Sequence, residues 1–355
     1  HGFLLIIVNW AVFLIFGLFC LRPFLEWYAE GNEALVSMGV EYGSVVLCLS
    51  CFIFTQVTCE KILQSTGNMI IPMLTNMLGC IANIILDPIM IFGYFGCPEM
   101  GALGAAIATV IGQAVGMTAV LCFFFFKEHP VKVKFKGFKF SWQTIKDIYV
   151  VALPGMIMQA IPSFVNIGIN MILIGFSTTA VFVLGVYFRV QSFIFMPVFG
   201  LSQGAMPIMG FNYGAKNKAR LLLAFRLAVS GALLYMIAGT LVFQVFPSQI
   251  LSAFAANEEA LAMGISAMRL LSLCFIPAAI GITTSTFFQA LGVGVYSLLI
   301  TLLRQAIIIL PFAYIASLYL GVTGVWLAWP VAEVFSLAAS IILFKRINRL
   351  KVKDL

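Results

Sequence analysis

Ten long apolar stretches constrain this chain more than any other feature of its sequence. A transmembrane helix needs about 20 mostly apolar residues, and each stretch is long enough to supply one. Of the 355 residues, 62% are hydrophobic and only 9% are charged, whereas a soluble domain carries about 25% charged residues. The sequence therefore predicts an all-α, polytopic membrane protein. The predicted spans are 2–22, 34–59, 69–95, 101–126, 149–176, 180–210, 221–246, 259–289, 294–319 and 322–344.

Basic residues gather in alternate connections between these spans. Most of the twenty Lys and Arg residues follow the second, fourth, sixth and tenth spans, including "KVKFKGFK" and the terminal "KRINRLKVK". Because positively charged loops remain in the cytoplasm, these segments and the C-terminus are expected on the cytoplasmic side of a cell membrane. The net charge of +7 thus predicts orientation in the membrane, and no nucleic-acid partner is expected.

An internal repeat divides the chain into two related halves. "EALVSMG" at 33–39 returns as "EALAMG" at 259–264, and an offset of 225, later 220, relates the following residues. Two spans precede the second copy and none precedes the first, so we expect ten helices of a twelve-helix protein that lacks its first two. The predicted organisation is an N-terminal lobe at 1–128 with helices 3–6, a basic cytoplasmic linker at 129–148, and a C-terminal lobe at 149–355 with helices 7–12. Two pseudo-symmetric bundles of this kind are common in secondary transporters.

The stretch "NIILDPIMIF" contains an acid in apolar surroundings. Placing the charged side chain of Asp87 inside a bilayer would cost about 2.5–3.5 kcal/mol, so a functional role is expected for it. Asn83 lies one helical turn earlier on the same face,, and Thr109 is expected at a similar depth on the next helix. Pro88 also frees the carbonyl of Ile84 from its helical bond. These oxygens form the kind of set that a hard cation prefers, so we predict a sodium or proton site.

The repeat supports a functional interpretation of this trio. Asp87, Asn83 and Thr109 correspond to Phe312, Ile308 and Trp329 in the second half, which therefore has no equivalent set.

The structural alternative is that Asp87 caps a helix end, or bonds to a backbone amide beside Pro88.

A polar stripe follows the span 149–176 at helical spacing: Gln159, Ser163, Asn166 and Asn170. The stripe is interpreted either as one wall of a water-filled substrate cavity or as a set of interhelical hydrogen bonds, each worth about 0.6 kcal/mol. The pattern alone does not separate the two.

Three further charged residues are predicted at mid-membrane depth. Glu333 is expected to pair with Arg269 or Arg189, either as static glue or as a latch in a transport cycle. Glu60 and Lys61, by contrast, are expected to form a solvated pair at the cytoplasmic edge.

Two motifs resemble a known family. "FGLSQGAMPIMGFNYGAKNKAR" (199–220) and "NIILDPIMIFGY…GALGAAIATVIGQ" (83–113) resemble the multidrug and toxic compound extrusion (MATE) family, in its bacterial drug-efflux branch. The resemblance implies a twelve-helix antiporter of two six-helix lobes that exports organic cation drugs in exchange for sodium or protons by alternating access. It also implies a cation site in the N-terminal lobe on the matching residues Asn83, Asp87 and Thr109.

Other functions are less consistent with the sequence. A flippase for lipid-linked oligosaccharide, within the same superfamily, is the principal alternative, since buried arginines would suit phosphate head groups. An intramembrane enzyme is not expected, because paired catalytic Asp, Ser/His and HExxH patterns are missing. A channel lacks a filter-like motif. No cofactor beyond the coupling ion is expected, and the protein is expected to be a monomer.

Overall fold

The computed structural model describes residues 1–28, 32–126, 138–254 and 257–352, and these residues form helices and short connections. Eight helices are long and apolar enough to cross a membrane on their own, and two bent helix pairs raise that number to ten within the described residues. The predicted all-α membrane fold is confirmed. The helices are α1 (Gly2–Ile15), η1 (Phe16–Cys20), α2 (Leu21–Tyr28), α3 (Glu33–Cys48), α4 (Cys51–Ser65), α5 (Ile70–Phe92), η2 (Tyr94–Gly96), α6 (Gly101–Phe126), α7 (Trp142–Ile174), α8 (Thr178–Gly214), α9 (Lys218–Val245), α10 (Pro247–Ala253), α11 (Glu258–Ser272), α12 (Phe275–Ala290), α13 (Gly294–Thr301), η3 (Leu302–Ile309), α14 (Leu310–Leu320), α15 (Val322–Ile347) and η4 (Asn348–Val352).

The two bent pairs occupy equivalent positions in the internal repeat. Helices α3 and α4 meet at 47°, and helices α11 and α12 meet at 44°. The breaks fall at residues 49–50 and 273–274, which the offset of 225 relates to within one residue. At each break a side chain donates to the carbonyl three residues earlier, Ser50 to Leu47 and Cys274 to Leu271, both at 2.8 Å. The same two carbonyls also accept from the backbone amides of Ser50 and Cys274, at 3.3 and 3.2 Å.

The chain divides into two compact units, His1–Ile145 and Lys146–Leu355. That boundary falls within the predicted linker 129–148. Residues 129–137 of the linker lie outside the described residues, and α7 already begins at Trp142.

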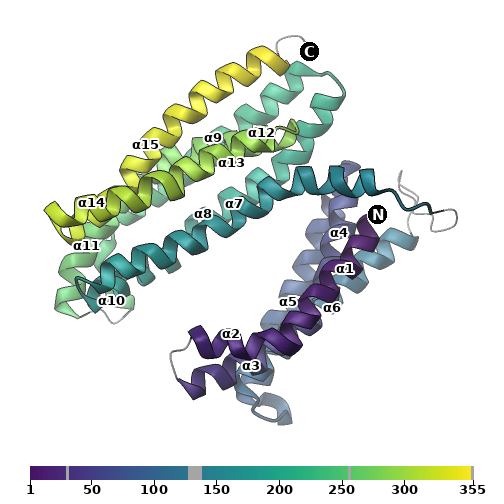
Figure 1. The fold of residues 1–355 in the computed structure, drawn as a ribbon, viewed down its shortest axis with the longest axis horizontal. Helices are drawn as coiled ribbons and strands as arrows, with labels where there is room; N and C mark the ends of the chain where they lie inside the picture. Colours follow the sequence, from purple (N-terminus) through teal and green to yellow (C-terminus); the bar gives the residue numbers. More distant parts are fainter. Residues whose placement is uncertain (29–31, 127–137, 255–256, 353–355) are drawn as a thin grey trace. The chain divides into compact units, whose positions relative to one another are not determined.

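The first unit is organised around the antiparallel helices α5 and α6 (Figure 1). A Cβ atom added at Gly79 would lie 2.8 Å from the carbonyl oxygen of Gly112, and one added at Gly112 would lie 2.8 Å from the oxygen of Gly79. A Cβ at Gly104 would meet the carbonyl of Met90. Small residues allow such close backbone approach, which is how helices associate in a membrane.

The second unit has a larger core. Helices α8, α9, α11, α12 and α15 surround fully buried aromatic side chains, among them Tyr187, Phe243, Phe275 and Trp326. Helix α14 turns at Gly321 and packs along α15 (Figure 1). A Cβ at Gly324 would meet the carbonyl of Ala316, so this hairpin repeats the close approach at Gly104 of the first unit, as the offset of 220 predicts.

Candidate functional site

The predicted polar trio lies on the α5–α6 pair. Asn83 faces α6 directly, because a Cβ atom at Gly112 would lie 3.0 Å from the Cβ of Asn83. The Asn83 amide donates from Nδ2 to Oδ1 of Asp87 at 3.1 Å. Gly112 of α6 lies against Asn83 of α5, and Gly104 lies against Met90. Because the two helices are antiparallel, Asp87 lies between these two levels, opposite residues 107–108 of α6. Thr109 therefore lies at the same level as Asp87.

The three side chains are partly buried, which fits a site that an ion can reach. The Thr109 hydroxyl donates to the carbonyl of Ala105 at 2.8 Å, leaving its oxygen lone pairs available. The amide nitrogen of Asn83, not its oxygen, faces Asp87. A half-turn of that amide would present oxygen to a cation. No Lys or Arg of the described residues lies within ion-pair distance of Asp87.

The structure corrects the prediction for Glu60. Instead of being solvated beside Lys61, Glu60 is 6% exposed, and its Oε1 accepts from Gln56 Nε2 at 2.9 Å and from Thr75 Oγ1 at 3.4 Å. Lys61 is exposed and donates to Gln64 at 3.1 Å. The adjacent opposite charges suggested a pair, but successive helical residues point in different directions, so Glu60 faces the interior.

The second unit contains a buried ion pair, but its members differ from the prediction. Glu333 on α15 lies 3.5 Å from Nη1 of Arg304 on η3. It does not pair with Arg269 or Arg189, whose side chains are exposed. Arg189, Arg269 and Arg304 all lie at helical positions that fit mid-membrane depth. Arg304 is the one that reaches Glu333, because η3 packs on α15.

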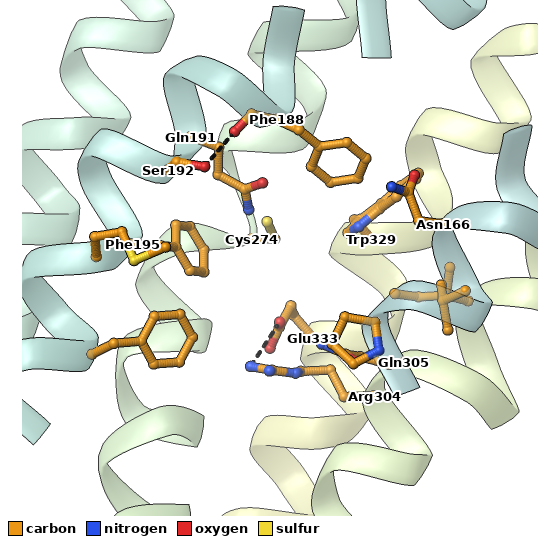
Figure 2. Close-up of a pocket in the computed structure, with 15 residues that line it drawn as sticks. Asn166, Phe188, Gln191, Ser192, Phe195, Cys274, Arg304, Gln305, Trp329 and Glu333 are labelled. Atoms are coloured by element: carbon orange, nitrogen blue, oxygen red, sulfur yellow. Dashed lines mark hydrogen bonds and ion pairs between the residues drawn. The ribbon is translucent and has the colours of Figure 1, made fainter. Parts of the chain in front are cut away.

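This ion pair borders an aromatic cavity of about 290 Å³. In Figure 2, Arg304 and Glu333 meet at the cavity, Phe195 lies on one side, and Trp329 and Asn166 lie on the other. The amide of Gln191 points toward the cavity between them. Oε2 of Glu333 is buried without a hydrogen-bond partner. An aromatic cavity with a few placed polar groups is typical of a small-molecule site.

A second, glutamine-lined cavity of about 350 Å³ also lies in this unit. It shares Arg304, Gln305, Pro162 and Phe199 with the aromatic cavity. Gln305 and Arg304 both belong to η3, a π-helical segment, and π-helical turns are frequent at functional sites.

The predicted polar stripe on α7 is divided between these cavities. Gln159 lines the glutamine-lined cavity and Asn166 lines the aromatic cavity. Asn170 lines neither; its Nδ2 donates to Oδ1 of Asn166 at 3.2 Å. Ser163 is exposed and also lines neither. Two members of the stripe therefore line a cavity, and the hydrogen bond between Asn170 and Asn166 lies within α7 and not between helices.

Glu333 was predicted to form an ion pair, but its partner Arg304 was not predicted. The offset of 225 relates Arg304 to Gly79, and the offset of 220 relates Glu333 to Gln113. In the first unit Gly79 closes the helix pair, whereas an arginine at the same position cannot make that contact. Gln113, like Glu333, has a buried side-chain oxygen without a hydrogen-bond partner.

Comparisons with known proteins agree with this arrangement. The MatE family model matches residues 1–89 and 154–315. The multidrug export protein MepA of Staphylococcus aureus (strain MSSA476) is 25% identical over 313 residues, covering 88% of this chain and 68% of MepA. MepA of Staphylococcus saprophyticus is 23% identical over 312 residues, with the same coverage.

Solved structures show the same fold. A multidrug resistance MATE family transporter of the MOP superfamily, in an outward-facing conformation, matches with a TM-score of 0.86 and 26% identity, covering 99% of this chain and 78% of its own. A MOP superfamily transporter from Pyrococcus furiosus, whose binding pocket is described as having reverse polarity, matches with a TM-score of 0.88 and 25% identity, covering 98% and 78%. The family match, the MepA relatives and the solved structures together show that the chain belongs to the MatE family of membrane-embedded multidrug transporters and is not an enzyme.

Proposed function

We propose that this protein is a secondary antiporter that exports organic cations in exchange for sodium or protons by alternating access. The observation that carries the proposal is Asp87, a carboxylate within a membrane-spanning helix that no basic residue of the described chain neutralises. An unpaired charge there costs about 2.5–3.5 kcal/mol, and a bound cation would offset that cost.

The coupling ion would bind on α5 and α6. Asp87 supplies the negative charge, and the oxygens of Asn83 and Thr109 complete a hard-ligand set suited to sodium. A proton could bind the same carboxylate, and protonation would remove the charge without requiring the neighbouring oxygens. Sodium coupling therefore requires Asn83 and Thr109, whereas proton coupling requires Asp87 alone.

The substrate would bind against α7 and the cavities of the second unit. Gln159 and Asn166 line those cavities, and aromatic walls such as Trp329 suit flat organic cations through cation–π contact. The family assignment and the MepA relatives support drug export. We also propose that the protein acts as a monomer in the bacterial cell membrane, with lobes at 1–128 and 149–355, a linker at 129–148 and the C-terminus in the cytoplasm.

Reconstituted efflux tests the proposal. The protein is placed in liposomes loaded with ethidium, and a sodium gradient or a pH gradient is imposed separately. Asp87→Asn should reduce gradient-driven efflux by at least about tenfold, because the amide carries no charge for the ion to balance. Glu41→Gln is the matched control, since Glu41 on α3 is exposed and lies outside the α5–α6 pair.

Two outcomes would contradict the proposal. Wild-type-like efflux by Asp87→Asn would remove this carboxylate from the coupling mechanism. Efflux that neither gradient accelerates in the wild-type protein would exclude antiport altogether.

A further inference from the structure

Exposed basic side chains gather at one end of the second unit. They come from the connection between α8 and α9, the first turn of α9, the last turn of α15, and η4 (Figure 1). Six exposed side chains form this basic patch: Lys216, Arg220, Lys345, Arg346, Arg349 and Lys351. Residues 214–226 and 342–352 contain no Asp or Glu, and residues 353–355 add Lys353 and Asp354 with no change in net charge.

Apolar packing beneath the basic patch joins its two segments. Phe225 of α9 stacks on Phe344 of α15, with ring centroids 4.9 Å apart and an interplanar angle of 18°. Leu221 belongs to the same buried cluster as Ile347 and Val352. The basic patch is therefore a surface that the folded unit holds in place, although its two segments are far apart in the sequence.

Exposed apolar side chains continue the basic patch along both helices. On α9, Arg220 shares a helical face with Leu223 and Leu227, which are 55% and 63% exposed,. On α15, Ile342 lies one turn before Arg346 and is 66% exposed. Each helix thus presents a basic end beside an apolar surface that belongs to a membrane span. A soluble anion would use only the charges, whereas a phospholipid would use both parts of this surface.

The backbone of Lys216 is a second, independent observation. Its φ is +56°, in the left-handed region where a residue with a Cβ atom is strained and glycine is not. The turn is a Schellman motif, because the N–H of Asn217 donates to the carbonyl of Asn212 at 2.9 Å and the N–H of Lys216 donates to that of Tyr213 at 3.1 Å,. Glycine is the usual residue at this position. A strained residue suggests a role for its side chain, and here that side chain is an exposed cation.

We propose that the basic patch binds the head group of an anionic phospholipid, whose acyl chains lie against the apolar faces of α9 and α15. Lys and Arg beside a membrane span are attracted to anionic head groups, and an arginine fork can hold a phosphate with two parallel N–H···O bonds. The C-terminus, proposed to be cytoplasmic, would place the basic patch at the inner leaflet. The inference goes beyond antiport, because lipid binding can be measured without transport.

Two lipids that differ only in the head group test this proposal. Dioleoylphosphatidylglycerol is anionic, dioleoylphosphatidylcholine is zwitterionic, and their acyl chains are identical. The melting temperature of the full-length protein is measured in nonionic detergent micelles that contain either lipid at the same mole fraction. A lipid that binds only the folded protein raises the melting temperature by mass action. The wild-type protein should melt about 3–5 °C higher with phosphatidylglycerol, the difference that an affinity preference of about tenfold produces in a unit of this size.

A triple variant removes charges from both segments of the basic patch: Arg220→Gln, Lys345→Gln and Arg346→Gln. The difference in melting temperature between the two lipids should fall by at least about half, because attraction to the head group grows with the number of basic side chains. A matched control removes three exposed charges elsewhere, and it should keep the wild-type difference: Lys61→Gln, Lys139→Gln and Lys146→Gln. Each variant is compared with itself in two lipids, so direct effects of the substitutions on stability cancel.

Two substitutions separate the strain at Lys216 from its charge. Lys216→Gly removes both, so it should raise the melting temperature in detergent alone and reduce the difference between the lipids. Lys216→Gln keeps the strain, so it should reduce the difference without raising the melting temperature. A wild-type difference in both variants would remove Lys216 from the lipid site.

Three other outcomes would overturn the proposal. The first is an equal melting temperature of the wild-type protein in the two lipids. The second is a triple variant that keeps the wild-type difference, or one that loses no more than its control, which would show attraction by net charge alone. The third is loss of the difference when inorganic phosphate replaces chloride at equal ionic strength, which would show a simple anion site. None of these results bears on antiport, which the efflux assay tests separately.

Discussion

Replacing Gly112 with alanine tests whether the close approach of α5 and α6 holds the Asp87 site together. The added Cβ would lie 2.8 Å from the carbonyl oxygen of Gly79 and 3.0 Å from the Cβ of Asn83. Ordinary contact begins near 3.4 Å, so the helices must separate by about 0.6 Å at this level. Overpacking of this kind costs about 1–3 kcal/mol.

The higher helix propensity of alanine offsets part of this overpacking cost. Alanine is favoured over glycine inside a helix by about 0.5–1 kcal/mol, so the free energy of unfolding should fall by about 1 kcal/mol in total. For a unit of this size such a change lowers the melting temperature by about 4 °C. Because the displaced helix carries Asn83, the sodium dependence of efflux should also weaken.

Thermal unfolding of the purified protein measures the first effect, and reconstituted efflux measures the second. Gly185→Ala on α8 is the control: an added Cβ there meets nothing within 4 Å, so the same substitution should be neutral or stabilising. An unchanged melting temperature for Gly112→Ala, or an equal loss in the control, would refute the argument from helix contact.

Three further predictions concern single side chains. Glu60→Leu should lower the free energy of unfolding by about 1–3 kcal/mol, because it leaves the buried amide of Gln56 without its acceptor,. Glu60→Gln keeps that acceptor and should be nearly neutral, and thermal unfolding compares the two. Thr109→Ala should weaken sodium-driven efflux more than proton-driven efflux, since only sodium needs the hydroxyl as a ligand; equal losses under the two gradients would contradict this. Trp329→Ala should weaken ethidium binding by roughly 0.5–2 kcal/mol, as measured by fluorescence titration, and unchanged affinity would place the dye elsewhere.

The sequence alone determined the fold class and the membrane spans. Ten apolar stretches leave few alternatives, because every backbone polar group must be satisfied inside the bilayer and helices do this locally. The repeat also relates Gly104 to Gly324, and the structure shows a close backbone approach at both glycines. Asn83 and Asp87 were predicted together because residues four apart share a helix face.

Only the tertiary structure decided which charges meet. Three arginines of the second unit fit the depth of Glu333, and the packing of η3 against α15 brings Arg304 within 3.5 Å while Arg189 and Arg269 remain exposed. The same holds for Glu60, whose sequence neighbour Lys61 turns away while Gln56 and Thr75 surround it. Helical periodicity fixes neighbours along one helix, but contacts between helices depend on rotation and register, and these are set by packing across the whole bundle.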